Sequence, residues 1–269
     1  MKSDNSSKVN RNRSVLKILW KNHEYILYYA GILLKQRVAG SYLGFLWLIL
    51  QPLMFMLIYT FVVTMIFQNR MEHFNIYVLI GLNAWTLFQR SVMMAATAIV
   101  RNKVIFEQVY FHKSVYPSLY LASYVYEFLI STSLVFVMMF FNGIPFTWHI
   151  IEIIPVLLAT VLFTYGCSLI IAHIGVYLFD LANILEFVLR FMFYLSPIMW
   201  NFANLNFRGA WVVKLNPMYV LIGSFRSCLL YGKSPVYGYL LIIAIVSCVL
   251  IQVGYSLISR YENEYARII

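Results

Sequence analysis

Charged residues are scarce in this sequence. Only 11% of its 269 residues are Asp, Glu, Lys or Arg, 62% are hydrophobic, and the mean hydropathy is +0.77. Because a soluble domain carries about 25% charged residues, this composition excludes a water-soluble fold. It predicts a single all-α integral membrane domain over residues 1–269, with no sizeable second domain.

The sequence also lacks the motifs that would indicate catalysis or metal binding. It contains no G-x-x-x-x-G-K-[ST], so no P-loop of its own for ATP hydrolysis, and no G-x-S-x-G. Its five histidines are not spaced as metal ligands, and no close carboxylate pair lies in a predicted exposed loop. Its three cysteines lie in or beside apolar segments without paired spacing, which favours packed membrane residues over a disulfide or a metal site. We expect no catalytic residue, no metal and no cofactor in this chain.

The first residues are polar and basic, without an apolar run and a small-residue cleavage site. A cleaved signal peptide is therefore not expected, and the N-terminus should stay in the cytosol. The net charge of +10 could indicate nucleic-acid binding, but in a membrane protein it fits the excess of cations in cytosolic loops better. We expect no nucleic-acid partner.

Residues 43–69 contain no Asp, Glu, Lys, Arg or His. As a helix it is long enough to cross the hydrocarbon core, which takes about 20 apolar residues. Pro52 and Gln51 lie well inside it, and both leave polar groups that need partners in lipid. This helix is therefore expected to pack against protein.

Hydropathy predicts six membrane-spanning helices, with short re-entrant helices on the extracytosolic side over 201–235 and a cytosolic interface helix over 14–36. In the interface helix, Lys17, Lys21 and Glu24 share one face. Of the 20 Lys and Arg residues, this topology places eight in 1–42, three in 101–116 and two after 259 in the cytosol, with both termini inside. No internal repeat is visible, which argues against inverted-repeat transporters. The six spans are predicted over 43–68, 76–98, 117–141, 150–178, 185–200 and 236–259.

Short motifs follow one another in an order and spacing that cover most of the chain. They are Gly40–Pro52 (GSYLGFLWLILQP), Gly81 with Trp85 and Phe88, Val109-Tyr110-Phe111 with Pro117, Tyr194-Leu195-Ser196-Pro197, and Asn216-Pro217 followed by Phe225-Arg226. Together they resemble the permease subunit of ABC transporters that export bacterial polysaccharides: O-antigen, capsule or teichoic acid. Two positions depart from that family's pattern, His112 where Pro is usual and Phe179 where Arg often precedes the acid.

The resemblance implies a homodimeric permease in the bacterial cytoplasmic (inner) membrane. A separate ABC ATPase subunit would bind ATP and Mg. A lipid-linked polysaccharide, in the first place O-antigen, would pass through a continuous channel lined largely by the first and fifth spans.

Aromatic side chains suit such a channel, since they offer apolar faces with polar handles for sugars. The candidate channel-lining residues are Tyr42, Phe45 and Tyr59 of the first span and Phe187, Phe191 and Tyr194 of the fifth. In a chain with 18% aromatics, however, such stripes also arise from ordinary packing or from membrane-interface belts. Both interpretations remain open at this point.

Ionisable groups inside spans are costly and therefore candidates for function. Arg190, with Lys35 and Arg37 at the base of the first span, could attract the pyrophosphate of the lipid carrier, because arginine matches phosphate oxygens. Alternatively, Glu186 and Arg190 pair at i, i+4, and Lys35 and Arg37 anchor at headgroups. Arg90 and Glu127, on adjacent spans, are expected to neutralise each other.

The connection 101–116 is too charged to span the membrane and mixes apolar anchors with polar residues. That mixture suits a short helix seated in a groove of a soluble partner, here the ATPase. The alternative is an ordinary amphipathic loop at the membrane surface. The candidate coupling residues are Phe106, Glu107, Gln108, Tyr110 and Phe111.

Other function classes fit less well. An ion-driven carrier would prefer an acidic relay and repeats, and Glu127 alone is thin support for it. A membrane glycan polymerase or ligase needs catalytic acids outside, yet 201–235 holds no Asp or Glu. An ABC-type exporter of a small amphipathic molecule remains the alternative.

Overall fold

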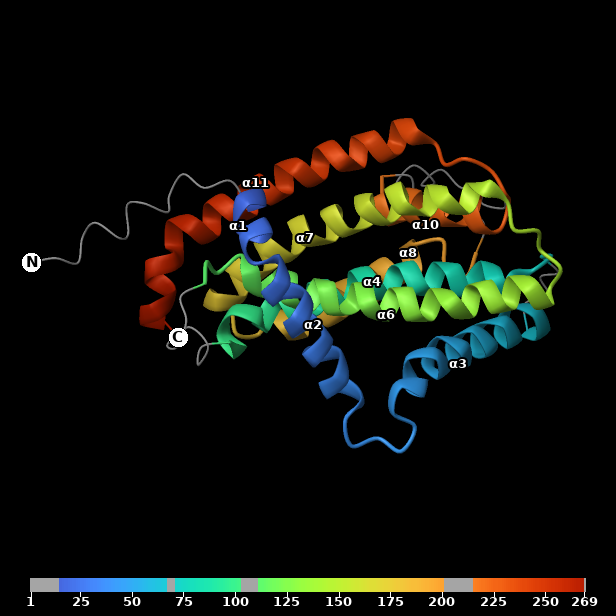
Figure 1. The fold of residues 1–269 in the computed structure, drawn as a ribbon, viewed down its shortest axis with the longest axis horizontal. Coiled ribbons are helices and arrows are strands. Elements are labelled where there is room, and N and C mark those ends of the chain that lie inside the picture. The colour runs from blue at the N-terminus through green and yellow to red at the C-terminus, as the bar shows by residue number, and fades with distance from the viewer. Residues whose placement is uncertain (1–14, 67–70, 103–110, 201–214, 269) are drawn as a thin grey trace, which may run out of the picture.

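The computed structural model describes residues 15–66, 71–102, 111–200 and 215–268, and over these ranges it is helical without a strand. Most of the helices run along the long axis of the molecule (Figure 1). In chain order the elements are α1 (Val15–Lys21), α2 (His23–Val38), the 3-10 turn η1 (Gly44–Leu46), α3 (Trp47–Phe61), the π-helical turn η2 (Val62–Ile66), α4 (Phe74–Arg101), α6 (Val115–Phe141), the 3-10 turn η3 (Trp148–Glu152), α7 (Ile153–Tyr177), α8 (Leu181–Leu195), α10 (Pro217–Leu229) and α11 (Tyr237–Ile268).

Helix α4 is the centre of the bundle. It packs against α3, α6, α7, α8 and α10, and nearly all of its residues from Ile76 to Phe88 are buried. Small residues allow this close packing: a Cβ at Gly175 of α7 would overlap the carbonyl oxygen of Ala96 in α4. Such contacts are typical of helix pairs in membranes, where small residues let backbones approach.

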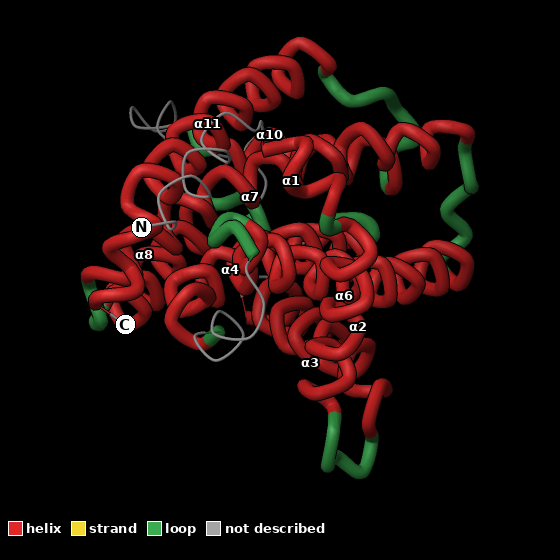
Figure 2. The backbone as a smooth tube through the Cα atoms, turned by 60° about the vertical axis from the view of Figure 1, so that its left-hand side comes forward, coloured by secondary structure: helices red, strands yellow, loops and turns green. Residues whose placement is uncertain are grey.

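Helices α1 and α2 do not run with the bundle but cross it (Figures 1 and 2). Helix α2 packs against α6, burying Ile26, Ala30 and Leu34 at helical spacing. The connection from α2 to α3 then projects from the bundle (Figure 1). It turns at Gly40 and Gly44, whose φ angles of 77° and 48° favour glycine.

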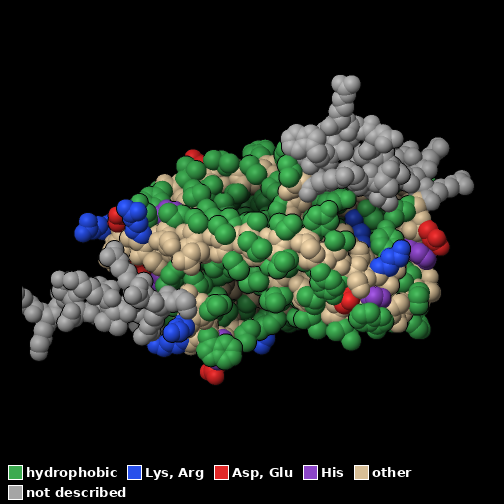
Figure 3. Space-filling view, turned by 90° about the horizontal axis from the view of Figure 1, so that it is seen from above, with side chains coloured by type: hydrophobic (Ala, Val, Ile, Leu, Met, Phe, Trp, Pro, Cys, Tyr) green, Lys and Arg blue, Asp and Glu red, His purple; other side chains and the backbone are tan. Residues whose placement is uncertain are grey.

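Within the described ranges, four helical segments are long and apolar enough to cross a membrane: Gly44–Met65, Val115–Phe141, Trp148–Tyr177 and Tyr237–Tyr265. Figure 3 shows hydrophobic side chains over the middle of one face, while charged and histidine side chains gather toward its two ends. This distribution fits a helical protein that crosses a bilayer. The predicted second and fifth spans correspond to α4 and α8, which are not among the four; the six-span topology stays a prediction.

Helix α8 differs most from its predicted span. The sequence indicates a span over 185–200, but α8 begins at Leu181 and ends at Leu195. The Ser196 amide closes its last turn on Met192 O and Phe193 O, and Pro197 follows. Fifteen residues extend about 22 Å, less than the roughly 30 Å of a hydrocarbon core.

Two other predicted boundaries also need correction. The interface helix is divided at Asn22, whose side chain bonds back to Ile18 O at 2.8 Å. The last helix continues nine residues beyond the predicted end, to Ile268. Of the predicted re-entrant pair, α10 is described, with Asn216 Oδ1 accepting from Met218 N at its start. The rest of that pair, within 201–214, lies outside the described residues.

Candidate functional site

Three charged side chains meet where α2, α4 and α6 converge. Glu127 of α6 accepts from Arg37 Nη1 at 2.6 Å through one carboxylate oxygen and from Arg90 Nη1 through the other. Arg37 also donates to Ser123 Oγ and lies 4.0 Å from the centre of the Tyr124 ring. The predicted pairing of Arg90 with Glu127 is confirmed, and Arg37 joins it. We call Arg37, Arg90 and Glu127 the charged triad.

The charged triad carries one excess positive charge and is only partly shielded from water. The Glu127 side chain is 11% exposed, against 29% for Arg37 and 32% for Arg90. A carboxylate shared by two guanidinium groups fixes the end of α2 to α4 and α6. Sequence analysis missed this role of Arg37, since a cation at the end of a span is by default interpreted as a headgroup anchor.

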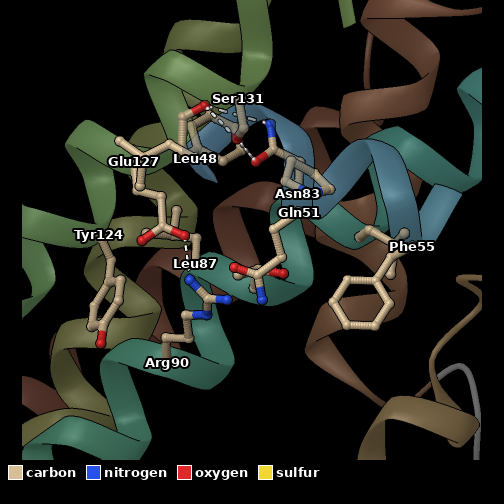
Figure 4. Close-up of a pocket in the computed structure, with 13 residues that line it drawn as sticks. Leu48, Gln51, Phe55, Asn83, Leu87, Arg90, Tyr124, Glu127 and Ser131 are labelled. Carbon is tan, nitrogen blue, oxygen red and sulfur yellow. Dashed lines mark hydrogen bonds and ion pairs between the residues drawn. The ribbon is translucent and has the colours of Figure 1, made fainter. Parts of the chain in front are cut away.

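Beside the triad, a small cavity separates α3 from α4 and α6 (Figure 4). Gln51 reaches toward Arg90 there, next to Pro52, while Ser131 donates to Asn83 and Asn83 donates to Thr132 Oγ1 at 2.9 Å. Gln51 and Pro52 thus line a cavity that also has polar side chains; no hydrogen bond joins the Gln51 side chain to the described residues. The cavity measures about 40 Å³, enough for water, which needs at least about 10–15 Å³, but not for a sugar.

Most of α3 is nevertheless open. Within its 22-residue candidate span only 17% of the most apolar window is buried, chiefly Leu48 and Met56. It packs on α4 and α6, and it touches α8 through Tyr59 and Phe193, whose ring centres are 6.0 Å apart. The described residues of this chain leave the rest of α3 uncovered.

Helix α8 has one buried face and one open face. Leu181, Leu185 and Leu189 are buried at four-residue spacing, whereas the candidate channel residues Phe187, Phe191 and Tyr194 are 70%, 66% and 59% exposed. Most of the surface of these three rings is therefore not covered by the described residues, although the Tyr194 ring also contacts Phe193. On the α2–α3 connection and η1, Tyr42 is fully exposed and Phe45 half exposed; Tyr59 is partly buried.

The open face of α8 also carries charge. Arg190 Nη2 donates to Glu186 Oε1 at 2.6 Å, and both side chains are more than half exposed. The predicted i, i+4 pair is thus confirmed. Lys35 is exposed on α2, and Arg37 is occupied by Glu127, so Lys35, Arg37 and Arg190 do not form one cluster of unpaired cations in the structure. It remains a prediction that the pyrophosphate of the lipid carrier is bound by Lys35, Arg37 and Arg190.

The end of the 101–116 connection is anchored on α2 and α11. The Phe111 ring stacks on Tyr25 of α2 at 4.5 Å. His112 Nε2 lies 3.0 Å from Ser259 Oγ of α11, and the Lys113 amide donates to Glu262 Oε1 at 3.2 Å. The predicted coupling residues Phe106, Glu107, Gln108 and Tyr110 lie outside the described residues.

His112 is uncharged at neutral pH. Burial, and then the charge of Lys113, lower the pKa of His112 from 6.5 to about 4. Its Nδ1 lies 2.8 Å from Ser114 Oγ, and its ring stacks on Tyr255. Sequence analysis marked His112 only as a departure from a pattern; its partners on α11 lie about 147 residues away in sequence, and no local signal indicates them.

Several of the short motifs meet around Arg226 of α10. Its guanidinium group is buried, donates to the carbonyl oxygens of Tyr77, Pro197 and Ile198, and lies 3.3 Å from the centre of the Tyr77 ring. A Cβ at Gly81 would come within 2.6 Å of Arg226 Nη2. The motifs at Gly81, Pro197 and Arg226 therefore join α4, the end of α8 and α10 in one structural cluster.

Comparison with known proteins places these features in context. The family model described as ABC-2 type transporter matches residues 29–230. The O-antigen export system permease protein RfbA of Myxococcus xanthus is 29% identical over 235 residues, 87% of this chain and 90% of that protein. The protein of the same name from Klebsiella pneumoniae is 26% identical over 237 residues, 88% of this chain and 91% of that protein.

Proposed function

The chain belongs to the ABC-2 type transporter family, and from that premise we propose that two copies form a channel through which a lipid-linked polysaccharide is exported. It is a membrane transport subunit of the polysaccharide-export kind. We propose O-antigen as the class of glycan, because the similar permeases are named for its export. A separate ABC ATPase would bind ATP and Mg and supply the energy.

The observation that carries the channel proposal is the open face of α8. Three aromatic rings and the Glu186–Arg190 ion pair are exposed on it. Charged groups within a membrane usually face protein or water, since exposure to lipid costs several kcal/mol. Aromatic faces with few fixed charges also suit a neutral, hydrated glycan. A water-filled passage closed by a second copy accounts for both features.

Two further roles are proposed on the same premise. Lys35, Arg37 and Arg190 guide the pyrophosphate of the carrier lipid, with Arg190 exchanging Glu186 for phosphate oxygens. The 101–116 connection transmits ATPase movement to the permease. The contacts of Phe111 with α2 and of His112 with α11 support the second role, because they join that connection to helices at the same end of the bundle.

One experiment tests all three statements. The permease is co-expressed with a candidate ATPase, reconstituted in liposomes, and assayed for ATP hydrolysis and export with lipid-linked O-antigen. We expect the glycan to stimulate hydrolysis, Arg190→Ala to raise several-fold the glycan concentration needed, and a Tyr110→Ala/Phe111→Ala double variant to hydrolyse ATP without export. Arg267→Ala, an exposed arginine at the end of α11, is the control.

Each arm of that assay can fail separately. Stimulation by a small amphipathic compound but not by the glycan would replace the proposed substrate. An Arg190→Ala complex that responds like the Arg267→Ala control would remove the phosphate role. Full export by the Tyr110/Phe111 double variant would remove the coupling role.

A further inference from the structure

A wide apolar groove separates α1 and the start of α2 from α6 and α7. It has a volume of about 910 Å³, some thirty times the roughly 30 Å³ that one water occupies in the liquid. We call it the N-terminal groove. Its apolar lining includes Leu19, Trp20, Ile26, Leu121, Val125 and Leu162.

Two walls of the groove are helices of the kind that crosses a membrane. Helices α6 and α7 are both among the segments long and apolar enough to span a bilayer. The few polar groups of its lining include Tyr126, whose hydroxyl group reaches Leu27 O of α2 at 3.4 Å. A groove so poor in hydrogen-bonding partners favours hydrocarbon over water or sugar.

Large apolar side chains at the rim remain uncovered by the described residues. Trp20 is 78% exposed, Leu16 75% and Leu27 48%. The other side of α1 does pack, since Val15 and Ile18 are buried. A tryptophan beside lysines on a helix that lies across the bundle is typical of the bilayer interface, where its apolar ring meets acyl chains.

The charged side chains at the rim of the groove are positive. Lys17 and Lys21, four residues apart, line the groove together with His23. No Asp or Glu occurs among the described residues that line it. Lysines at a membrane surface attract anionic headgroups by about 1 kcal/mol each, so charge and lining together match a molecule with an anionic head and apolar chains.

We propose that the N-terminal groove holds an anionic phospholipid of the surrounding bilayer. Its acyl chains lie between α1–α2 and α6–α7, and its phosphate lies between Lys17 and Lys21. The placement of this phosphate at the cytosolic surface rests on the membrane orientation proposed above. The lipid completes the packing of α1 and α2, and thereby sets the position of the helix that carries Arg37.

The test measures lipid binding and needs no transport. The full-length protein is purified in mild detergent, and its bound lipids are counted by native mass spectrometry after addition of phosphatidylglycerol or phosphatidylethanolamine. We expect the wild-type protein to retain phosphatidylglycerol in preference to phosphatidylethanolamine. In a Lys17→Gln/Lys21→Gln variant this preference should be at least about tenfold weaker. Lys233→Gln, an exposed lysine outside the groove, should retain it.

A second variant tests the cavity itself. Ala122 of α6 lines the groove, and Ala122→Phe should displace the acyl chains and release phosphatidylglycerol at several-fold lower detergent concentration. Equal retention of both lipids by the wild-type protein, or unchanged retention in both variants, would overturn the proposal. So would displacement of phosphatidylglycerol by an equimolar lipid-linked glycan, which would make the groove a substrate site. If the reconstituted wild-type complex fails to export the glycan while the permease still binds phosphatidylglycerol, that result would count against the proposed function alone.

Discussion

At the residue scale, the charged triad joins three helices through one carboxylate. Glu127 bonds both Arg37 and Arg90, and it is the most shielded of the three, with 11% of its side chain exposed. Removing the shared acid leaves two guanidinium groups facing each other, whereas removing one arginine leaves the other pair intact. The triad is therefore expected to behave as a unit.

We predict that Glu127→Gln destabilises the protein by about 2 kcal/mol, since hydrogen bonds to charged groups contribute about 1.5–3 kcal/mol and the arginines keep some water contact. Once Glu127 is replaced, Arg37→Gln should cost less than about 0.5 kcal/mol more. Denaturant unfolding in detergent measures both values. Glu24→Gln, an exposed acid on α2, serves as control; additive losses for Glu127 and Arg37 would show that they act independently.

His112 makes the stability of the folded protein depend on pH. The pKa of His112 is about 4 in the folded protein and about 6.5 when exposed, so the unfolded chain binds the extra proton between these values. Stability from the uncharged ring is complete above pH 6.5 and is lost as pH falls toward 4. Glu262, 3.8 Å from Nε2, and Lys113 are the charged groups that face it.

The wild-type protein should therefore lose on the order of 2–3 kcal/mol between pH 6.5 and pH 4. His112→Gln should flatten that part of the curve, because glutamine does not titrate. Urea unfolding at half-unit pH steps gives the comparison. If the two curves remain parallel over this range, His112 is not the group that titrates.

At the element scale, the contact between α4 and α7 depends on a glycine. Gly175 lies against the backbone of Ala96, which cannot move aside as a side chain can. We predict that Gly175→Ala destabilises the protein by about 1–3 kcal/mol through overpacking. Gly31→Ala in α2, where a Cβ meets nothing within 4 Å, should be neutral or stabilising by up to about 1 kcal/mol. Thermal unfolding of the two variants measures both effects. A smaller loss of stability in Gly175→Ala than in Gly31→Ala would contradict this prediction.

Also at this scale, sequence analysis located helices better than their ends. Hydropathy predicted the helical stretches 43–68, 76–98, 117–141 and 150–178 to within a few residues, since an apolar run in lipid has to be helical. It placed α8 too far along the chain, because the apolar run continues through Pro197 to Trp200 while the helix stops at Leu195. It also missed the last turns of α11, whose polar residues bind the 112–114 segment instead of leaving the fold.

At the scale of the whole molecule, pairings between distant helices could be inferred only in part. Arg90 and Glu127 were paired from their places on adjacent spans, and Glu186 and Arg190 from helical spacing. Arg37 lies 90 residues from Glu127, and its position depends on how α2 crosses the bundle. The carbonyl partners of Arg226 come from two separate segments, Tyr77 and Pro197–Ile198; such contacts follow from the folded arrangement and have no local pattern.

A channel formed by two copies requires that the open face of α8 is in contact with water and not with lipid. Substituted-cysteine labelling tests this in the assembled transporter, after replacement of Cys167, Cys228 and Cys248. Cysteines introduced at Phe187, Phe191 and Tyr194 should react with a membrane-impermeant thiol reagent and be protected by the glycan. A cysteine at Val249, exposed on α11, should not react. If the α8 positions are as unreactive as Val249 in the assembled, ATP-hydrolysing complex, the channel proposal is contradicted.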